Sequence, residues 1–297
     1  MYPVHYIEPV FRPPSEWQSL IIQVTIGCSH NACTFCDMYQ DDHKRFKTKS
    51  IEEIDAELKR VADDGKPVKR IFLADGDAMA LSTRRLTAIL ISIRQYFPSV
   101  QRVSSYCLPS NLANKSVEEL TQLRELGLSL MYVGCETGDN ELLGIINKKE
   151  TYQSSLSALV KIKQAGMKSS VMILNGLGGQ TLSKQHVNRS AALMNEAQPD
   201  YLSTLVVNFS PGGEDKFSAP FKGRWVKLQQ QQLFQELYDL ISLLHLNKTI
   251  FRSDHISNRL VLKGVLGKDK DNLLARIQLA MDTPNLIPLR PERHRAL

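Results

Sequence analysis

The chain has 297 residues, which is long enough for one large domain or two small ones with a sizeable hydrophobic core. Hydrophobic residues make up 42% of the sequence and charged residues 23%, so the composition excludes a disordered, collagen-like or disulfide-stapled chain. The net charge of +6 is modest for this length and selects no class of partner. We find neither a membrane-spanning apolar run nor a signal-peptide layout, and we therefore expect a cytoplasmic protein without membrane contact.

Short apolar runs alternate with longer amphipathic stretches after an arm that is rich in proline and aromatic residues. The expected strands cover residues 20–25, 70–74, 102–106, 129–134, 168–174 and 201–207. The expected helices cover residues 51–63, 82–97, 116–126, 152–165, 183–197 and 225–246. Such an alternation predicts an α/β fold, a partial (β/α)6 TIM-like barrel with parallel strands.

Three parts are expected along the chain. Residues 1–17 form an N-terminal arm, residues 18–248 the partial barrel, and residues 249–297 a C-terminal helical cap or tail. In barrels of this kind, the loops that follow the strands carry the chemistry. The unusual residues of this chain gather in those loops: three cysteines after the first strand, an Asp-Gly-Asp sequence after the second, and glycine-rich segments after the fifth and sixth.

The loop after the first expected strand contains Cys28, Cys33 and Cys36 within nine residues. In a reducing compartment this density indicates a metal or cluster site rather than a disulfide framework. Structural zinc needs a fourth protein ligand, for which His30, His43 or a distant cysteine is available. A [4Fe-4S] cluster held by three thiolates instead leaves one iron open to a cofactor or substrate. The residues alone do not decide between a zinc site and an iron–sulfur cluster.

The cysteine loop resembles the cluster-binding loop of the radical S-adenosylmethionine (SAM) superfamily, with Phe35 at the aromatic position before the last cysteine. Its spacing, CxxxxCxxC, is one residue longer than the usual CxxxCxxC. The resemblance implies that Cys28, Cys33 and Cys36 bind a [4Fe-4S] cluster whose open iron chelates SAM. It further implies an enzyme that cleaves SAM reductively to a 5′-deoxyadenosyl radical, which abstracts hydrogen from an unidentified substrate. A flavodoxin or ferredoxin is the implied electron donor.

Further motifs extend the resemblance over residues 18–210. The sequence FLADGD stands where the superfamily has a motif that receives the amino group of SAM, which implies this role for Asp75, Gly76 and above all Asp77. A segment like that of the coproporphyrinogen-oxidase and elongator-like branch implies that Glu136 faces the ribose and that Lys148 binds the carboxylate.

A glycine-rich segment at residues 171–179 completes the resemblance. It is similar to the superfamily's loop beside the adenine, which implies that role for Gly176 and Gly178. No residue of the chain is identified as acting on the substrate.

Other functions stay open. Cys107 and Cys135 follow neighbouring strands, and a second cluster there would fit a sulfur-inserting enzyme of the biotin- or lipoyl-synthase type; packing in the core is the simpler role. An RNA-modifying radical SAM enzyme is a further alternative, although the chain has no appended RNA-binding module and no basic patch interleaved with aromatics. The non-enzymatic alternative is a structural protein whose cysteines bind zinc or iron.

Overall fold

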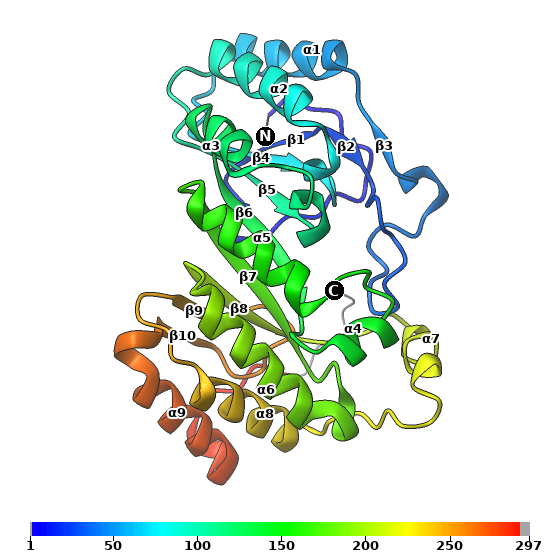
Figure 1. Cartoon of the computed structure of the whole chain (residues 1–297), viewed down its shortest axis with the longest axis vertical. Helices are drawn as coiled ribbons and strands as arrows, with labels where there is room; N and C mark the ends of the chain where they lie inside the picture. The colour runs from blue at the N-terminus through cyan, green and yellow to red at the C-terminus, as the bar shows by residue number, and fades with distance from the viewer. Residues whose placement is uncertain (1, 292–297) are drawn as a thin grey trace. The chain divides into compact units, whose positions relative to one another are not determined.

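The computed structural model describes residues 2–291, and Figure 1 labels its elements. The chain forms two compact units. Unit 1 comprises the chain up to Asn31 together with Met38–Val133 and Ser157–Ser169. Unit 2 comprises Ala32–Asp37, Gly134–Leu156 and the chain from Ser170 onward. The division falls inside the cysteine loop, so Cys28 belongs to unit 1 whereas Cys33 and Cys36 belong to unit 2.

Unit 1 is built on parallel strands. Its strand order is β1 (Leu20–Gln23), β4 (Arg70–Ala74), β5 (Arg102–Cys107) and β6 (Leu128–Glu136), and each pairs with the next in parallel. A separate antiparallel pair, β2 (Thr25–Ile26) and β3 (Lys47–Thr48), joins the two ends of the segment that carries the cysteine loop. Short 3-10 segments lie at Pro14–Glu16, Asp42–Lys44, Ala78–Ala80 and Pro109–Leu112.

The helices of unit 1 begin at residues that cap them. Helices α1 (Ile51–Asp63), α2 (Thr83–Tyr96) and α3 (Val117–Glu125) follow Ser50, Ser82 and Ser116, whose hydroxyls accept hydrogen bonds from the first-turn backbone. Helix α1 packs on α2 and α2 on α3, on one side of the strands (Figure 1). The buried positions of α2 recur at helical spacing, which is why this face joins the core.

Unit 2 continues the α/β pattern. Strands β7 (Lys168–Asn175), β8 (Tyr201–Val206) and β9 (Ile250–Ser253) pair in parallel, and β10 (Leu262–Val265) joins β9 antiparallel. Its helices are α4 (Asn140–Ile145), α6 (Gly179–Ala197), α7 (Gly213–Ser218), α8 (Gln230–Leu243) and α9 (Leu266–Asp282), with 3-10 segments at Ala219–Phe221 and Pro284–Leu286. Helix α6 packs on α8, and α8 packs on α9 (Figure 1). Helix α5 (Tyr152–Gln164) contributes residues to both units.

The expected α/β fold with parallel strands is confirmed, and a strand forms at each of the six predicted places. Among the described strands, β1 and β10 each have one neighbour in the strand order, as in a partial rather than a closed barrel. The expected C-terminal cap contains α9, but it begins with β9 and β10, because Phe251 and Ser253 alternate with more exposed neighbours as in a half-buried strand. None of the helices in residues 2–291 has the length and apolar character of a membrane span.

Candidate functional site

The cysteine loop leaves β2 in a conformation that requires glycine. Gly27 has a φ of +69°, and a Cβ there would collide with the carbonyl oxygen of Lys44. Two residues later, the hydroxyl of Ser29 donates a hydrogen bond to Asp77 Oδ2. The backbone on either side of Cys28 is therefore fixed within unit 1, and one of its anchors is the Asp-Gly-Asp loop that follows β4.

Asp77 is fully buried and retains an acceptor. Its Oδ2 accepts from Ser29 and, at 3.5 Å, from Asn111 Nδ2. Its Oδ1 is buried and has no hydrogen-bond partner among the described residues. Burial raises the pKa of Asp77, against the opposing effects of its hydrogen bonds and of the Lys115 ammonium. A buried carboxylate with one unsatisfied oxygen is suited to an ammonium group.

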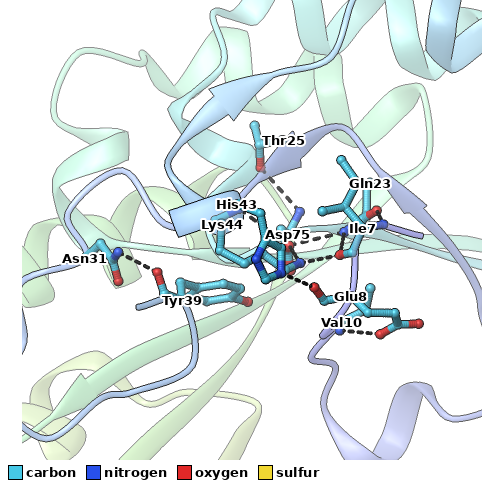
Figure 2. Close-up of polar contacts among 11 residues, drawn as sticks. Ile7, Glu8, Val10, Gln23, Thr25, Asn31, Tyr39, His43, Lys44 and Asp75 are labelled. Atoms are coloured by element: carbon cyan, nitrogen blue, oxygen red, sulfur yellow. Dashed lines mark hydrogen bonds and ion pairs between the residues drawn. The ribbon is translucent and has the colours of Figure 1, made fainter. Parts of the chain in front are cut away.

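The other two residues of this loop contact the protein itself, although Asp75 Oδ1, like Asp77 Oδ1, is buried without a hydrogen-bond partner among the described residues. Asp75 Oδ2 lies 2.7 Å from Lys44 Nζ, and it also accepts from Gln23 Nε2 and Gly27 N, as Figure 2 shows in part. Burial raises the pKa of Asp75, and the Lys44 ammonium opposes this rise. At Gly76, a Cβ would collide with the ring of Tyr39. The assignment of Asp75 and Gly76 to the cofactor thus stays a prediction, and their visible contacts are with the cysteine loop and its surroundings.

The second half of the cysteine loop docks on the end of α4 in unit 2. Thr34 N donates to Ile146 O at 3.0 Å, and Asn147 Nδ2 donates to Ala32 O at 3.0 Å. Within the loop, Cys36 N donates to Cys33 O at 3.2 Å. These contacts to the backbone of the loop fix the segment that carries two of the three thiols.

A buried ion pair lies beside this segment. Lys148 Nζ is 2.8 Å from Glu136 Oε1 and 5.8 Å from the centre of the Phe35 ring. Gly134 leaves room for the pair, since a Cβ there would collide with Glu136. Burial alone would lower the pKa of Lys148, but the charge of Glu136 and the nearby Cys33 outweigh burial and raise it. The structure therefore brings together Cys33, Phe35, Glu136 and Lys148, which sequence reasoning assigned to one site.

The turn after Glu136 is held by α6. Thr137 Oγ1 lies 2.8 Å from His186 Nδ1, and Gly138 N donates to Ser190 Oγ at 3.0 Å. A Cβ at Gly138 would collide with the carbonyl of Arg189, so only glycine allows this approach. Asp139 Oδ1 then caps α4 by accepting from Leu142 N at 2.8 Å. In the sequence Glu-Thr-Gly-Asp, the three residues after the buried Glu136 therefore have structural roles: Thr137 and Gly138 contact α6, and Asp139 caps α4.

The glycine-rich segment depends on a residue that sequence reasoning missed. Gly176 has a φ of +82°, and its N–H donates to Glu236 Oε1 at 2.6 Å. Burial raises the pKa of Glu236 to about 7, although Ser183 and Gly176 both donate to this carboxyl group. Gly178 caps the start of α6, where a Cβ would lie 2.9 Å from the backbone of Leu182. The only sequence signal for Glu236 is an acidic residue on the apolar face of α8.

The remaining two cysteines are buried. Cys107 Sγ lies 3.3 Å from the carbonyl oxygen of Leu108. Burial raises the pKa of Cys135 to about 12, and the Ser155 hydroxyl of α5 lies beside it. The second cluster of the sulfur-insertion hypothesis stays a prediction, because a metal deprotonates its thiol ligands when it binds, whatever their pKa in the metal-free protein.

Whether Cys28, Cys33 and Cys36 converge on one cluster stays a prediction. All three thiols are half-buried rather than sealed in the core, and none forms a disulfide. In residues 2–291, no three His, Cys, Asp or Glu side chains are grouped as the ligands of one metal ion. The donor set itself fits the cluster, because three thiols complete three of the four iron positions of a cubane and leave one open.

Residues 22–189, more than half of the chain, match the radical SAM superfamily. The chain belongs to this superfamily. Its members use a [4Fe-4S] cluster and SAM. The resemblance inferred from the cysteine loop is therefore confirmed.

Comparisons with individual proteins agree with this assignment. The chain is 24% identical over 225 residues to the heme chaperone HemW of Bacillus subtilis, covering 72% of this chain and 56% of HemW. Coproporphyrinogen III oxidase (HemN) of Escherichia coli superposes with a TM-score of 0.58 at 18% identity, over 75% of this chain and 51% of HemN. Methylornithine synthase (PylB) superposes with a TM-score of 0.52 at 16% identity, over 88% of this chain and 81% of PylB.

At these identities, the structural likeness to HemN and PylB shows the fold alone. The chain also spans about half the length of the curated relatives it matches.

Proposed function

We propose that the chain holds one [4Fe-4S] cluster through Cys28, Cys33 and Cys36, binds SAM at its open iron and cleaves it reductively to abstract hydrogen from a substrate. The observation that carries this proposal is a pair of buried charged groups, each beside one half of the cysteine loop. Asp77 is hydrogen-bonded to Ser29, next to Cys28, and Lys148 lies near Cys33 and Phe35. Each group by itself suits one end of the methionyl part of SAM: Asp77 suits the ammonium and Lys148 the carboxylate.

The chain's own residues would bind and orient the cofactor. The unsatisfied Oδ1 of Asp77 would accept a hydrogen bond from the amino group of SAM. Lys148 has three donors on its ammonium, of which Glu136 uses one, so two remain for the carboxylate. When bound, the cluster and SAM supply the electron transfer and bond cleavage that protein side chains lack.

Glu136 and the glycine-rich segment would hold the nucleoside part. Lys148 contacts one carboxylate oxygen of Glu136, and the other would accept from a ribose hydroxyl. Gly176 and Gly178 would lie beside the adenine, as the likeness of this segment to the superfamily's loop implies. Glu236 would act on this site indirectly, by fixing the backbone of Gly176.

An acidic flavodoxin or ferredoxin would deliver the electron at the exposed end of the cysteine loop. Arg45, Phe46 and Lys47 are exposed there, and β3 is paired to the strand that leads into Cys28. Charge complementarity between such surfaces speeds association. We expect Lys47→Glu to slow reduction by flavodoxin at low salt and to leave reduction by dithionite unchanged; slowing with both reductants would contradict this docking site.

The test of the proposal is the formation of 5′-deoxyadenosine. Anaerobically reconstituted protein, given SAM and dithionite, should release it, and Cys33→Ala should abolish the product. Cys135→Ala is the matched control and should retain it, because that thiol is buried away from solvent. No nucleoside from a preparation that contains the cluster would contradict the proposal.

A second candidate comes from the Bacillus subtilis relative, which is named a heme chaperone and aligns with 72% of this chain. A protein with this role would bind haem. Stoichiometric haem binding in the same preparation, without deoxyadenosine, would favour the chaperone role over SAM cleavage.

A further inference from the structure

We propose that Lys44 is a positioning residue: with Ile7, Gln23 and Asp75 it forms a latch that fastens the N-terminal arm and the returning end of the cysteine loop to the loop that carries Asp77. All four residues lie in unit 1. Figure 2 shows them gathered around the Asp75 carboxylate.

Lys44 is the charged centre of the latch. Its side chain has no exposed surface, although the residues on both sides of it, His43 and Arg45, are exposed. Its Nζ lies 2.7 Å from Asp75 Oδ2 and also donates to the carbonyl oxygen of Ile7. One ammonium thus joins the cysteine loop, the N-terminal arm and the loop after β4.

Gln23 connects the same partners from the end of β1. Its Oε1 accepts from Ile7 N at 2.9 Å, and its Nε2 donates to Ile7 O at 3.0 Å and to Asp75 Oδ2 at 3.2 Å. The Gln23 side chain therefore satisfies both the N–H and the carbonyl of Ile7, which holds the N-terminal arm at this residue.

Further contacts around the latch join the N-terminal arm to residues 39–44. His43 Nε2 lies 2.8 Å from the Glu8 carbonyl oxygen, so the neighbour of Lys44 also contacts the arm. The Tyr39 ring packs edge-on against Phe11 at 5.4 Å and covers Gly76. The arm and the returning loop, residues 39–44, therefore lie together over the Asp-Gly-Asp sequence.

Burial makes these contacts cooperative. A buried ammonium or carboxylate that lacks its partner is strongly unfavourable, so neither Lys44 nor Asp75 is stable in place without the other. The side-chain amide of Gln23 in turn depends on the backbone of Ile7 for two of its hydrogen bonds. We infer that the arm and residues 39–44 order together or not at all, and that Asp75 serves this contact through its Oδ2.

Only the consequence for cofactors rests on the proposed function: a closed latch would hold the cluster loop and Asp77 in fixed relation within unit 1. The latch itself is testable in cofactor-free protein, by hydrogen exchange of the full chain. The reporters are the amides of Ile7 and Lys44, which are hydrogen-bonded to Gln23 Oε1 and to the Asp41 carbonyl.

In Lys44→Met we expect both reporters to exchange about tenfold faster, together, because the arm and the loop share one opening reaction. Lys49→Met is the matched control, since Lys49 also pairs with a carboxylate in unit 1, that of Glu57, outside the latch. It should leave both reporters unchanged. Acceleration at one reporter alone, or at neither, would overturn the proposal.

Gln23→Leu keeps the proposal testable if Lys44→Met does not fold. This variant removes the amide bonds to Ile7 without leaving a buried charge unpaired. The latch predicts faster exchange at Lys44 as well as at Ile7, whereas a change confined to Ile7 would contradict it. Because no cluster is present in either experiment, failure here is distinct from failure to cleave SAM.

Discussion

Lys148 Nζ lies 2.8 Å from Glu136 Oε1, and both side chains are almost completely buried. The two residues flank α4, on whose end the second half of the cysteine loop docks. Charges held in this way are pre-oriented and need no rearrangement of solvent when a ligand arrives. The pair therefore supports the local structure and, in our account, the cofactor.

Removing one partner of this pair should destabilise the protein strongly. We expect Lys148→Met to lower the free energy of unfolding by about 3–5 kcal/mol, because it leaves the Glu136 carboxylate buried without its partner. Glu136→Gln combined with Lys148→Met should cost clearly less than the sum of the single variants. Urea unfolding of the four proteins measures this coupling, and simple additivity would show that the two charges do not interact.

Asp77→Asn should weaken SAM binding without loss of the cluster. Loss of one charge-assisted hydrogen bond predicts a Kd about tenfold higher, equivalent to about 1.4 kcal/mol. Equilibrium dialysis of reconstituted protein with labelled SAM measures this change, and iron content should be unaltered. Asp63→Asn, at an exposed acid of α1, is the control. An unchanged Kd in Asp77→Asn would remove this residue from the site.

The Cys135 thiol should resist alkylation in the native protein. Burial raises its pKa to about 12, so almost no thiolate exists at pH 8. Iodoacetamide followed by mass spectrometry should label Cys33 in cofactor-free protein and should label Cys135 only after unfolding in urea. Rapid labelling of Cys135 in the native protein would contradict this burial and this raised pKa.

Two buried groups should give opposite pH dependences of stability. Burial raises the pKa of Glu236 to about 7, so the folded state holds a proton that the unfolded state releases above its ordinary value of 4.5. This contribution to stability is complete below pH 4.5 and is lost as the pH rises towards 7. Burial lowers the pKa of His186 to about 4, so its contribution is complete above pH 6.5 and is lost as the pH falls towards 4.

The two effects nearly cancel between pH 4.5 and 6.5 in the unmodified protein. Glu236→Gln should therefore expose the His186 effect, and stability should rise by about 1.4 kcal/mol per pH unit relative to the unmodified protein. His186→Gln should give the opposite slope. Urea unfolding across this range measures both, and profiles parallel to that of the unmodified protein would contradict these shifts.

The parts of the fold that sequence predicted best are those with a local signal. Apolar runs located the six strands, and the helices expected over residues 51–63, 82–97 and 116–126 begin within one residue of α1, α2 and α3. Strand β9 was not predicted, because it has only four residues and includes Arg252, so its alternation of buried and more exposed residues is too short to recognise in the sequence.

The site was predictable where the family motif is contiguous. Glu136 and Lys148 were assigned to one site, and they do lie together. The roles of Lys44 and Glu236 were not predicted, because a long-range contact that buries a charge leaves no periodicity in the sequence. For the same reason, nothing local indicated that Asp75 would meet a lysine 31 residues earlier in the chain.

The most direct test of the central claim is the metal content of anaerobically reconstituted protein. We predict about four iron and four acid-labile sulfide per chain, as one cubane cluster requires. A clear excess of iron would indicate a second cluster. Zinc without iron would contradict the account, because the three cysteines would then only stabilise a loop.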